Sequence, residues 1–256
     1  MLVLIRGAGE IASGIALRLR SVGFDVVMTE LDTPTAVCRK AAFAEAVRTD
    51  EQTVESVTAR RAGNANAARE LLSRGILPVL ADPEARCCKA LRPDLLVDAI
   101  CAGENLGTKL SDAKLVVGVG AGFTAGLDCH AVIGDASGHT LGRVYYRGGV
   151  PAESPEIRFA LERPLFAPTD GEFIGARRIG DTVRAGETVG VVSGNPVTAE
   201  VSGALRGLTA DGMKVSRGAK VGVIDAAGRP ENCYSASGKA LAVAGGVLEA
   251  LLKLGR

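Results

Sequence analysis

The chain has 256 residues, of which 47% are hydrophobic and 4% aromatic, and it contains no tryptophan. Its 30 basic and 29 acidic residues nearly cancel, so the composition indicates no basic surface and we expect no nucleic-acid partner. This length is typical of one large domain or of two domains of modest size.

The N-terminus and the cysteines bear on the location of the protein. The first residues, MLVLIRGAGE, run directly from a short apolar stretch into a glycine turn, which leaves no room for a secretory leader. No stretch approaches the roughly 18 uninterrupted apolar residues of a membrane span. The six cysteines form no CxxC pair, which indicates reduced thiols. We therefore expect a cytoplasmic protein that does not enter a membrane; whether it forms a homo-oligomer is left open.

Apolar runs alternate with helical stretches over the first half of the chain. The predicted strands lie at 2–5, 25–28, 76–80, 95–100 and 114–119, and such continuous runs suit strands that are covered on both faces. The predicted helices lie at 11–23, 35–47 and 64–75, the last of which begins at a candidate N-cap, Asn64. This alternation predicts a Rossmann-like, doubly wound α/β domain over residues 1–165.

The second half carries an internal repeat. Glycines recur 32 residues apart, as in Gly171 and Gly203 or Gly180 and Gly212, and a fixed period indicates duplicated supersecondary structure. Two such units resemble the barrel-sandwich hybrid of biotinyl and lipoyl carrier domains, which we expect over residues 166–226, followed by a helical tail over 227–256. The segment VSGNPVTAE (192–200) lacks the lysine to which carriers attach their group. We therefore expect neither biotin nor lipoate, and predict a docking or scaffold module.

The segment LIRGAGEIASG (4–14) carries the first motif with chemical meaning. Gly7, Gly9 and Ala12 match G-x-G-x-x-[GA] between a predicted strand and a predicted helix. There the glycines permit the turn and the approach of a pyrophosphate, and the helix N-terminus attracts the anion. Glu30 closes the next predicted strand, where an acid binds a ribose hydroxyl. We predict a site for NAD(P) or another nucleotide; a glycine turn required only for packing is the alternative.

A second glycine loop follows the predicted strand at 114–119, in the stretch GVGAGFTAGLDCHAVIGD (118–135). Ligands of open α/β sheets bind at the carboxyl edge of the strands, so this loop should lie near the first. The residues that we assign to cofactor binding here are Gly120, Gly122, Thr124, Asp128 and, as an anion clamp further along the chain, Arg143.

The candidate catalytic residues are Cys129, His130 and His139. The two histidines are the only ones in the chain, and together they could supply an acid–base pair. With Asp128 these residues include zinc-ligand types, but neighbours along a strand point to opposite faces, so we predict no metal site. A hydrogen-bonded core histidine at position 130 and a turn residue at position 139 are the alternatives.

Several blocks of the sequence, taken in order, resemble a known family. They are VLIRGAGEIASGIALRLRSVGFDVVMTELDTPTAVCRKAAFAEAV, DLLVDAI with NLGT, GVGAGFTAGLDCHAVI, GHTLGRVYY and AGGVLEALL. The series resembles the YqeB-type family of selenium-dependent molybdenum hydroxylase maturation proteins over nearly the whole chain. Two stretches depart from the family pattern. Gly103 and Glu104 stand where a basic pair is expected, and GDASGH (134–139) replaces Glu-Thr followed by Arg-Gly-His.

The resemblance implies an accessory protein that holds a nucleotide or a pterin dinucleotide, such as molybdopterin cytosine dinucleotide, while selenium or sulfur is installed. It implies a molybdenum hydroxylase or other maturation proteins as partners, and Cys129 is the candidate thiol relay. Two other functions stay open. One is an NAD(P)-dependent oxidoreductase with His130 or Lys109 as its acid–base residue, and the other is a non-catalytic interaction protein.

Overall fold

The structure, a computed structural model, describes residues 1–151 and 162–255. The chain divides into two compact units. Unit 1 comprises Met1–Pro34, Ala42–Phe159 and Ala236–Arg256, and unit 2 comprises Thr35–Ala41 and Ala160–Ser235. Among the described residues, no helix combines the length and the apolar character that crossing a bilayer requires.

Within the described residues, unit 1 is built on a nine-stranded sheet with the order β3-β4-β5-β2-β1-β6-β7-β8-β9. The strands are β1 (Leu2–Arg6), β2 (Asp25–Glu30), β3 (Glu51–Val54), β4 (Val57–Ala62), β5 (Leu77–Ala81), β6 (Leu95–Asp98), β7 (Leu115–Val119), β8 (Ala131–Ile133) and β9 (Val144–Tyr145). The helices are α1 (Glu10–Ser21), α2 (Glu45–Thr49), α3 (Ala65–Ser73), α4 (Cys88–Leu91), η2 (Leu110–Asp112) and α5 (Gly238–Leu254).

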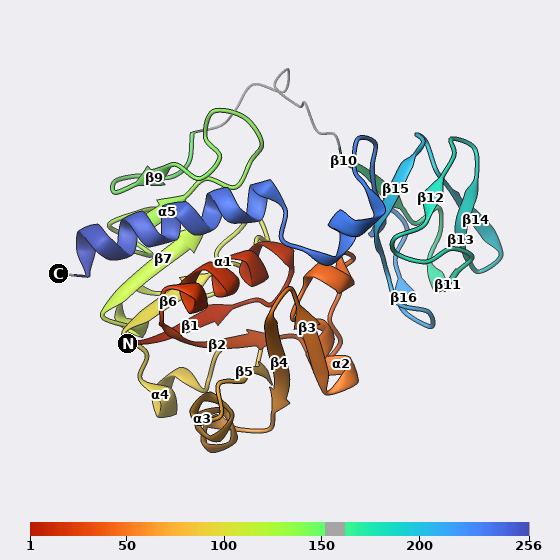
Figure 1. The fold of residues 1–256 in the computed structure, drawn as a ribbon. Coiled ribbons are helices and arrows are strands. Elements are labelled where there is room, and N and C mark those ends of the chain that lie inside the picture. Colours follow the sequence, from red (N-terminus) through yellow and green to blue (C-terminus); the bar gives the residue numbers. More distant parts are fainter. Residues whose placement is uncertain (152–161, 256) are drawn as a thin grey trace. The chain divides into compact units, whose positions relative to one another are not determined.

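The central strands of this sheet run parallel, from β4 across to β8. Both outer strands run the other way: β3 pairs antiparallel with β4, and β9 pairs antiparallel with β8. Figure 1 shows α1 and α5 side by side on one face of the sheet and α3 on the other. Asn64 caps α3 as predicted, because its side chain accepts hydrogen bonds from the amides of Asn66 and Ala67, both at 3.0 Å.

The close packing of α5 depends on two glycines. A Cβ atom on Gly14 of α1 would lie 2.6 Å from the Cβ of Ala240 in α5. A Cβ atom on Gly246 would lie 2.5 Å from the carbonyl oxygen of Gly142. Since real Cβ contacts are not this short, both glycines are required for the helix to reach its neighbours. The pair Gly245 and Gly246 does not interrupt α5, which is one continuous helix of 17 residues.

Unit 2 contains, in the part that the structure describes, two four-stranded antiparallel sheets with the orders β10-β17-β15-β12 and β14-β13-β11-β16. The strands are β10 (Glu162–Phe166), β11 (Gly171–Gly175), β12 (Thr182–Val183), β13 (Thr188–Val192), β14 (Asn195–Thr198), β15 (Gly203–Leu208), β16 (Lys214–Val215) and β17 (Lys220–Asp225). Two short 3-10 helices, η1 (Arg39–Ala41) and η4 (Pro230–Tyr234), belong to the same unit.

The period of 32 residues recurs in the strands of unit 2. β11, β12 and β13 begin at residues 171, 182 and 188, and β15, β16 and β17 begin at residues 203, 214 and 220. The two copies exchange strands: one sheet takes its inner strands, β17 and β15, from the second copy and its outer strands, β10 and β12, from the first. The other sheet takes its inner strands, β13 and β11, from the first copy and its outer strands, β14 and β16, from the second. Buried side chains of both copies, such as Phe173 and Leu205, therefore share one core.

The predicted helix at 35–47 is mostly absent. Only η1 and α2 are helical there, and residues 35–41 instead join unit 2. The amide of Leu208 in β15 donates to the carbonyl of Val37 at 2.9 Å, and Arg39 Nε donates to the carbonyl of Leu208 at 2.8 Å. Apart from the short 3-10 helix η1, the segment thus forms hydrogen bonds with a strand far along the chain instead of the predicted helix.

The predicted fold class, a Rossmann-like doubly wound domain followed by a small lipoyl/biotinyl-like barrel-sandwich hybrid and a C-terminal helix, is therefore wrong in the types of its two domains. The large sheet is mixed, because antiparallel strands close both of its edges. The described part of the second unit contains two four-stranded antiparallel sheets. The C-terminal helix packs on α1 and is part of unit 1.

Candidate functional site: the carboxyl edge of the large sheet

Strands β1, β2, β6, β7 and β8 are neighbours and parallel, so their carboxyl ends meet at one edge of the sheet. The loops that leave this edge contain glycines in the left-handed region. φ is 93° at Gly7, 87° at Gly120 and 94° at Gly122. Side chains rarely tolerate such angles, so these turns require glycine. Both predicted glycine loops therefore start from this edge.

The first glycine loop joins β1 to α1. The amide of Gly7 donates to the carbonyl of Thr29 at 2.9 Å. Gly9 is the N-cap of α1, with a φ of −65°, and having no side chain it supplies no capping hydrogen bond. A Cβ atom on Gly9 would meet nothing within 4 Å. Ala12, in the first turn, is fully buried. The N-terminus of α1 therefore receives no hydrogen bond from a side chain at its N-cap position, and there is open space next to Gly9.

Glu30 lies beside this loop and binds it. One carboxylate oxygen accepts a hydrogen bond from the Ala8 amide at 2.9 Å, and the other accepts from the Leu31 amide at 2.8 Å. Burial raises the pKa of Glu30, and these two hydrogen bonds oppose that rise. The carboxylate therefore holds the turn in place.

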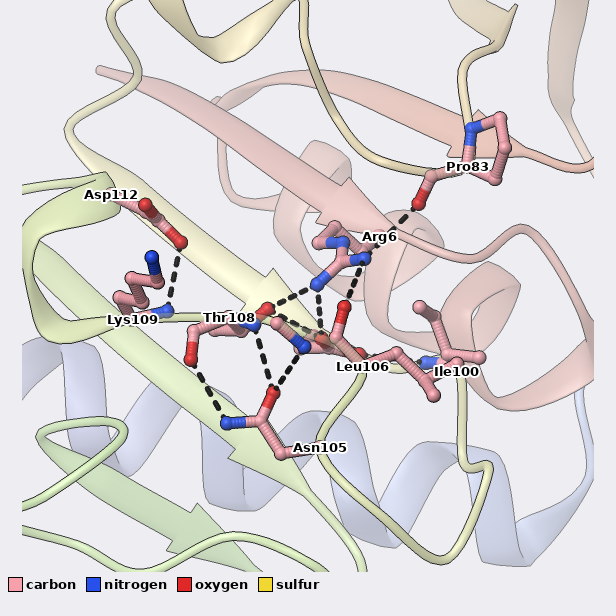
Figure 2. A network of polar contacts seen from close by, with 10 residues as sticks. Arg6, Pro83, Ile100, Asn105, Leu106, Thr108, Lys109 and Asp112 are labelled. Carbon is pink, nitrogen blue, oxygen red and sulfur yellow. Dashed lines mark hydrogen bonds and ion pairs between the residues drawn. The ribbon is translucent and has the colours of Figure 1, made fainter.

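A buried ion pair joins the ends of β1 and β6. Arg6 and Asp98 are opposite each other in the parallel register, and Arg6 Nη1 lies 2.9 Å from Asp98 Oδ2. Only 6% of the Arg6 side chain and 2% of the Asp98 side chain are exposed. Thr108 Oγ1 donates to Asp98 at 2.6 Å and also contacts Arg6 Nη1. Figure 2 shows Arg6 at the centre of this network, between Pro83 and the segment that contains Leu106 and Thr108.

The side chain of Asn105 forms hydrogen bonds within segment 99–109, which follows β6. Its side-chain oxygen accepts from the amides of Gly107 and Thr108, and its side-chain nitrogen donates to the Thr108 carbonyl at 2.9 Å (Figure 2). The backbone amide of Lys109 donates to Asp112 at 2.8 Å, and the Lys109 side chain is exposed. The segment is thus locally rigid and partly open to solvent.

The second glycine loop contacts both this segment and the end of β8. A Cβ atom on Gly122 would clash with the backbone of Glu104, and a Cβ atom on Gly120 would lie 2.9 Å from the carboxyl of Asp135. Thr124 and Asp128 are engaged with each other: the Thr124 amide donates to the Asp128 side chain at 2.9 Å, and the Asp128 amide donates to the Thr124 carbonyl at 3.0 Å. These two residues therefore form a local turn.

The candidate catalytic residues are not brought together. His130 Nδ1 accepts a hydrogen bond from the Val116 amide at 3.0 Å, so this nitrogen serves the pairing of β7 with the start of β8. His139 is exposed in the loop after β8, at the opposite end of that strand, where its carbonyl accepts from Arg143 Nε. Cys129 is fully buried in an apolar cluster, and burial raises the pKa of its thiol to about 11.

Arg6, Asp98, Asn105 and Thr108 are the polar residues of this edge that the sequence interpretation did not assign. The available signal was a charged residue that closes each of two apolar strands, LVLIR and LLVD. Within the described residues, no group of three or more His, Cys, Asp or Glu side chains is placed to hold a metal ion.

The chain has a relative in Escherichia coli (strain K12), named "Uncharacterized protein YqeB". It is 44% identical over 259 residues, which cover 99% of this chain and 48% of the relative. No protein-family model matches. Two solved structures are similar. A succinylglutamate desuccinylase/aspartoacylase from Rhodobacter sphaeroides is 18% identical over 56% of this chain and 60% of that chain, with a TM-score of 0.25. An aspartoacylase family protein from Mesorhizobium loti is 14% identical over 87% of this chain and 83% of that chain, with a TM-score of 0.29.

The YqeB-type part of the family resemblance is supported by 44% sequence identity in an alignment that covers 99% of the chain. The chain also spans only about half the length of that relative. Over almost its whole length the chain is thus similar in sequence to about half of the YqeB protein of Escherichia coli.

Proposed function

We propose that the carboxyl edge of the large sheet binds a nucleotide or a pterin dinucleotide, and that the protein acts as an accessory factor in the maturation of selenium-dependent molybdenum hydroxylases. The observation that carries the binding proposal is the loop Gly7–Gly9. It places the N-terminus of α1 at the sheet edge, supplies no side-chain cap and leaves the space above Gly9 open. Helix N-termini of this kind bind phosphate groups.

The second glycine loop would supply the other end of the site. It leaves the same edge, and segment 99–109 lies against both loops, at Gly7 and at Gly122. A ligand with two separated polar groups could bind the backbone of one glycine loop with each group. Glu30 holds the turn through the Ala8 amide and would remain within reach of a ribose or pterin hydroxyl.

In this proposal the chain holds the ligand, and the assigned residues bind rather than react. The buried thiol of Cys129 is poorly suited to a relay, because a relay thiol must be accessible and ionise readily. The link to molybdenum hydroxylases rests on the family resemblance in the quoted sequence blocks, and a hydroxylase or another maturation protein would be the partner. An NAD(P)-dependent oxidoreductase and a non-catalytic scaffold are the functions that the binding experiment must separate from this one.

The experiment is isothermal titration calorimetry of the purified chain with molybdopterin cytosine dinucleotide, NAD⁺, NADP⁺ and ATP. The test variant is Gly9→Val, and the matched control is Gly63→Val. An added Cβ atom meets nothing within 4 Å at either glycine, and neither glycine has a left-handed φ, so both variants should fold.

We expect one dinucleotide to bind the wild type and the Gly63→Val variant, and Gly9→Val to weaken that binding at least tenfold, since the valine occupies the space of the phosphate. Binding of NAD⁺ or NADP⁺ together with hydride transfer would favour the oxidoreductase. No binding of any of the four compounds would refute the proposal and favour a scaffold.

A further inference from the structure

The Arg6–Asp98 pair stands out because it buries two charges at the ends of strands that are otherwise apolar. Removing charges from water is costly, and a buried ion pair is often no better for stability than well-packed apolar residues. Stability alone therefore does not account for this pair. The contacts that it makes point to a role in placing the surrounding loops.

Arg6 joins three separate segments of the chain. Nη1 binds Asp98 at the end of β6, and Nη2 donates to the carbonyl of Pro83 at 3.1 Å, just after β5, and to the carbonyl of Leu106 at 3.2 Å. The planar fork of a guanidinium can serve these acceptors together, which the single nitrogen of a lysine cannot do. Figure 2 shows these contacts converging on the one side chain.

Asp98 holds the other side of segment 99–109. One oxygen accepts from the Ile100 amide at 3.2 Å, and the other accepts from Thr108 Oγ1 at 2.6 Å. The segment is therefore tied at its start by Asp98 and at its end by Asp98 and Arg6 together. Its middle is free of these two residues, and there Glu104 lies against Gly122.

Segment 99–109 touches both glycine loops of the proposed ligand edge. At its start, the carbonyl of Ala99 would lie 2.9 Å from a Cβ atom on Gly7. In its middle, the backbone of Glu104 leaves no room for a Cβ atom on Gly122. A shift of the segment would therefore change the position of one loop relative to the other.

We propose that Arg6 and Asp98 are positioning residues for ligand binding: they fix segment 99–109 against the two glycine loops and so set the spacing of the two ends of the site. This inference rests on the proposed function as far as the ligand is concerned. It also makes a claim about the protein without ligand: the guanidinium group of Arg6 protects the backbone amides of segment 99–109 from hydrogen exchange.

The experiment uses the full chain and the Arg6→Lys variant, which keeps the charge beside Asp98 but loses the fork. A second variant, Thr108→Val, removes one hydroxyl from the network and keeps both charges. The matched control is Arg60→Lys, which alters the exposed pair of Arg60 and Glu51, 2.9 Å apart on β3 and β4. Amide hydrogen exchange is measured without ligand, and calorimetry is measured with NAD⁺ and molybdopterin cytosine dinucleotide.

We expect Arg6→Lys and Thr108→Val to raise exchange in residues 99–109 at least tenfold while the central strands remain protected, and to weaken binding at least tenfold. Arg60→Lys should change neither. If amide exchange in residues 99–109 is unchanged in the two variants, the inference is overturned whether or not a ligand binds. An equal rise of exchange throughout unit 1 also overturns it, because the Arg6–Asp98 pair would then only stabilise the fold. If the wild type binds neither of these compounds, nor NADP⁺ or ATP, the proposed function fails, and the exchange result still decides whether Arg6 and Asp98 fix segment 99–109.

Discussion

The carboxylate of Glu30 accepts a hydrogen bond from the amide of Ala8, 22 residues earlier, at 2.9 Å. This bond ties the end of β2 to the turn that starts α1, within a setting where burial raises the pKa of the acid. A carboxyl group in that position both shapes the loop and carries an electrostatic cost at neutral pH.

The Glu30→Gln variant should reveal that cost as a dependence on pH. The folded chain holds the Glu30 proton more tightly than the unfolded chain does, so its stabilising contribution is complete below the ordinary pKa of 4.5 and is lost as the pH rises through the raised value. Glutamine does not ionise, and its amide oxygen can still accept from Ala8. In urea unfolding, the variant should therefore gain stability relative to the wild type between pH 4.5 and pH 7.5. If the wild type instead gains stability relative to the variant as the pH rises over this range, the pKa of Glu30 is not raised in the folded protein.

The neighbouring glycines of α5 should respond to alanine in opposite directions. Gly245 is exposed and has nothing within 4 Å of an added Cβ atom, so Gly245→Ala should stabilise the helix by about 0.5–1 kcal/mol. Gly246 faces the Gly142 carbonyl, which would lie 2.5 Å from the new atom, so Gly246→Ala should destabilise the protein by about 1–3 kcal/mol. Urea unfolding of the two variants gives both values, and similar shifts would contradict the packing of α5.

Cys129 should be unreactive in the native protein. Its side chain is fully buried and burial raises its pKa to about 11, so little thiolate forms at pH 7.5 and reagents cannot reach it. Iodoacetamide labelling followed by mass spectrometry should modify Cys129 only after unfolding in urea. Labelling of Cys129 in the native protein at the rate of a free thiol would restore it as a candidate relay.

The local parts of the fold were predictable from the sequence. The strand LVLIR, the glycine turn after it and helix α1 follow from a short apolar run, a glycine pattern and helical periodicity, all within 21 residues. The period of 32 residues likewise recurs in the strands of unit 2. In each case the signal lies within a short stretch of chain.

The non-local parts were not predictable. β3 is the polar sequence EQTV and β9 has two residues, so neither antiparallel edge carries an apolar pattern that marks a strand. The segment at 35–41 has helical periodicity but pairs with β15, 169 residues away in the case of Arg39 and Leu208. Arg6 and Asp98 are separated by 92 residues, and only the sheet order makes them neighbours.

The strand exchange in unit 2 has a consequence for synthesis of the protein. Each sheet draws two of its four strands from each repeat, so a ribosome that has made only the first repeat has not yet made any complete sheet. Residues 35–41 are made before both repeats and stay unpaired until β15, which ends at residue 208, has been made. The nascent chain therefore exposes unpaired strand edges until the second repeat has been made, and such edges can pair with other chains and aggregate.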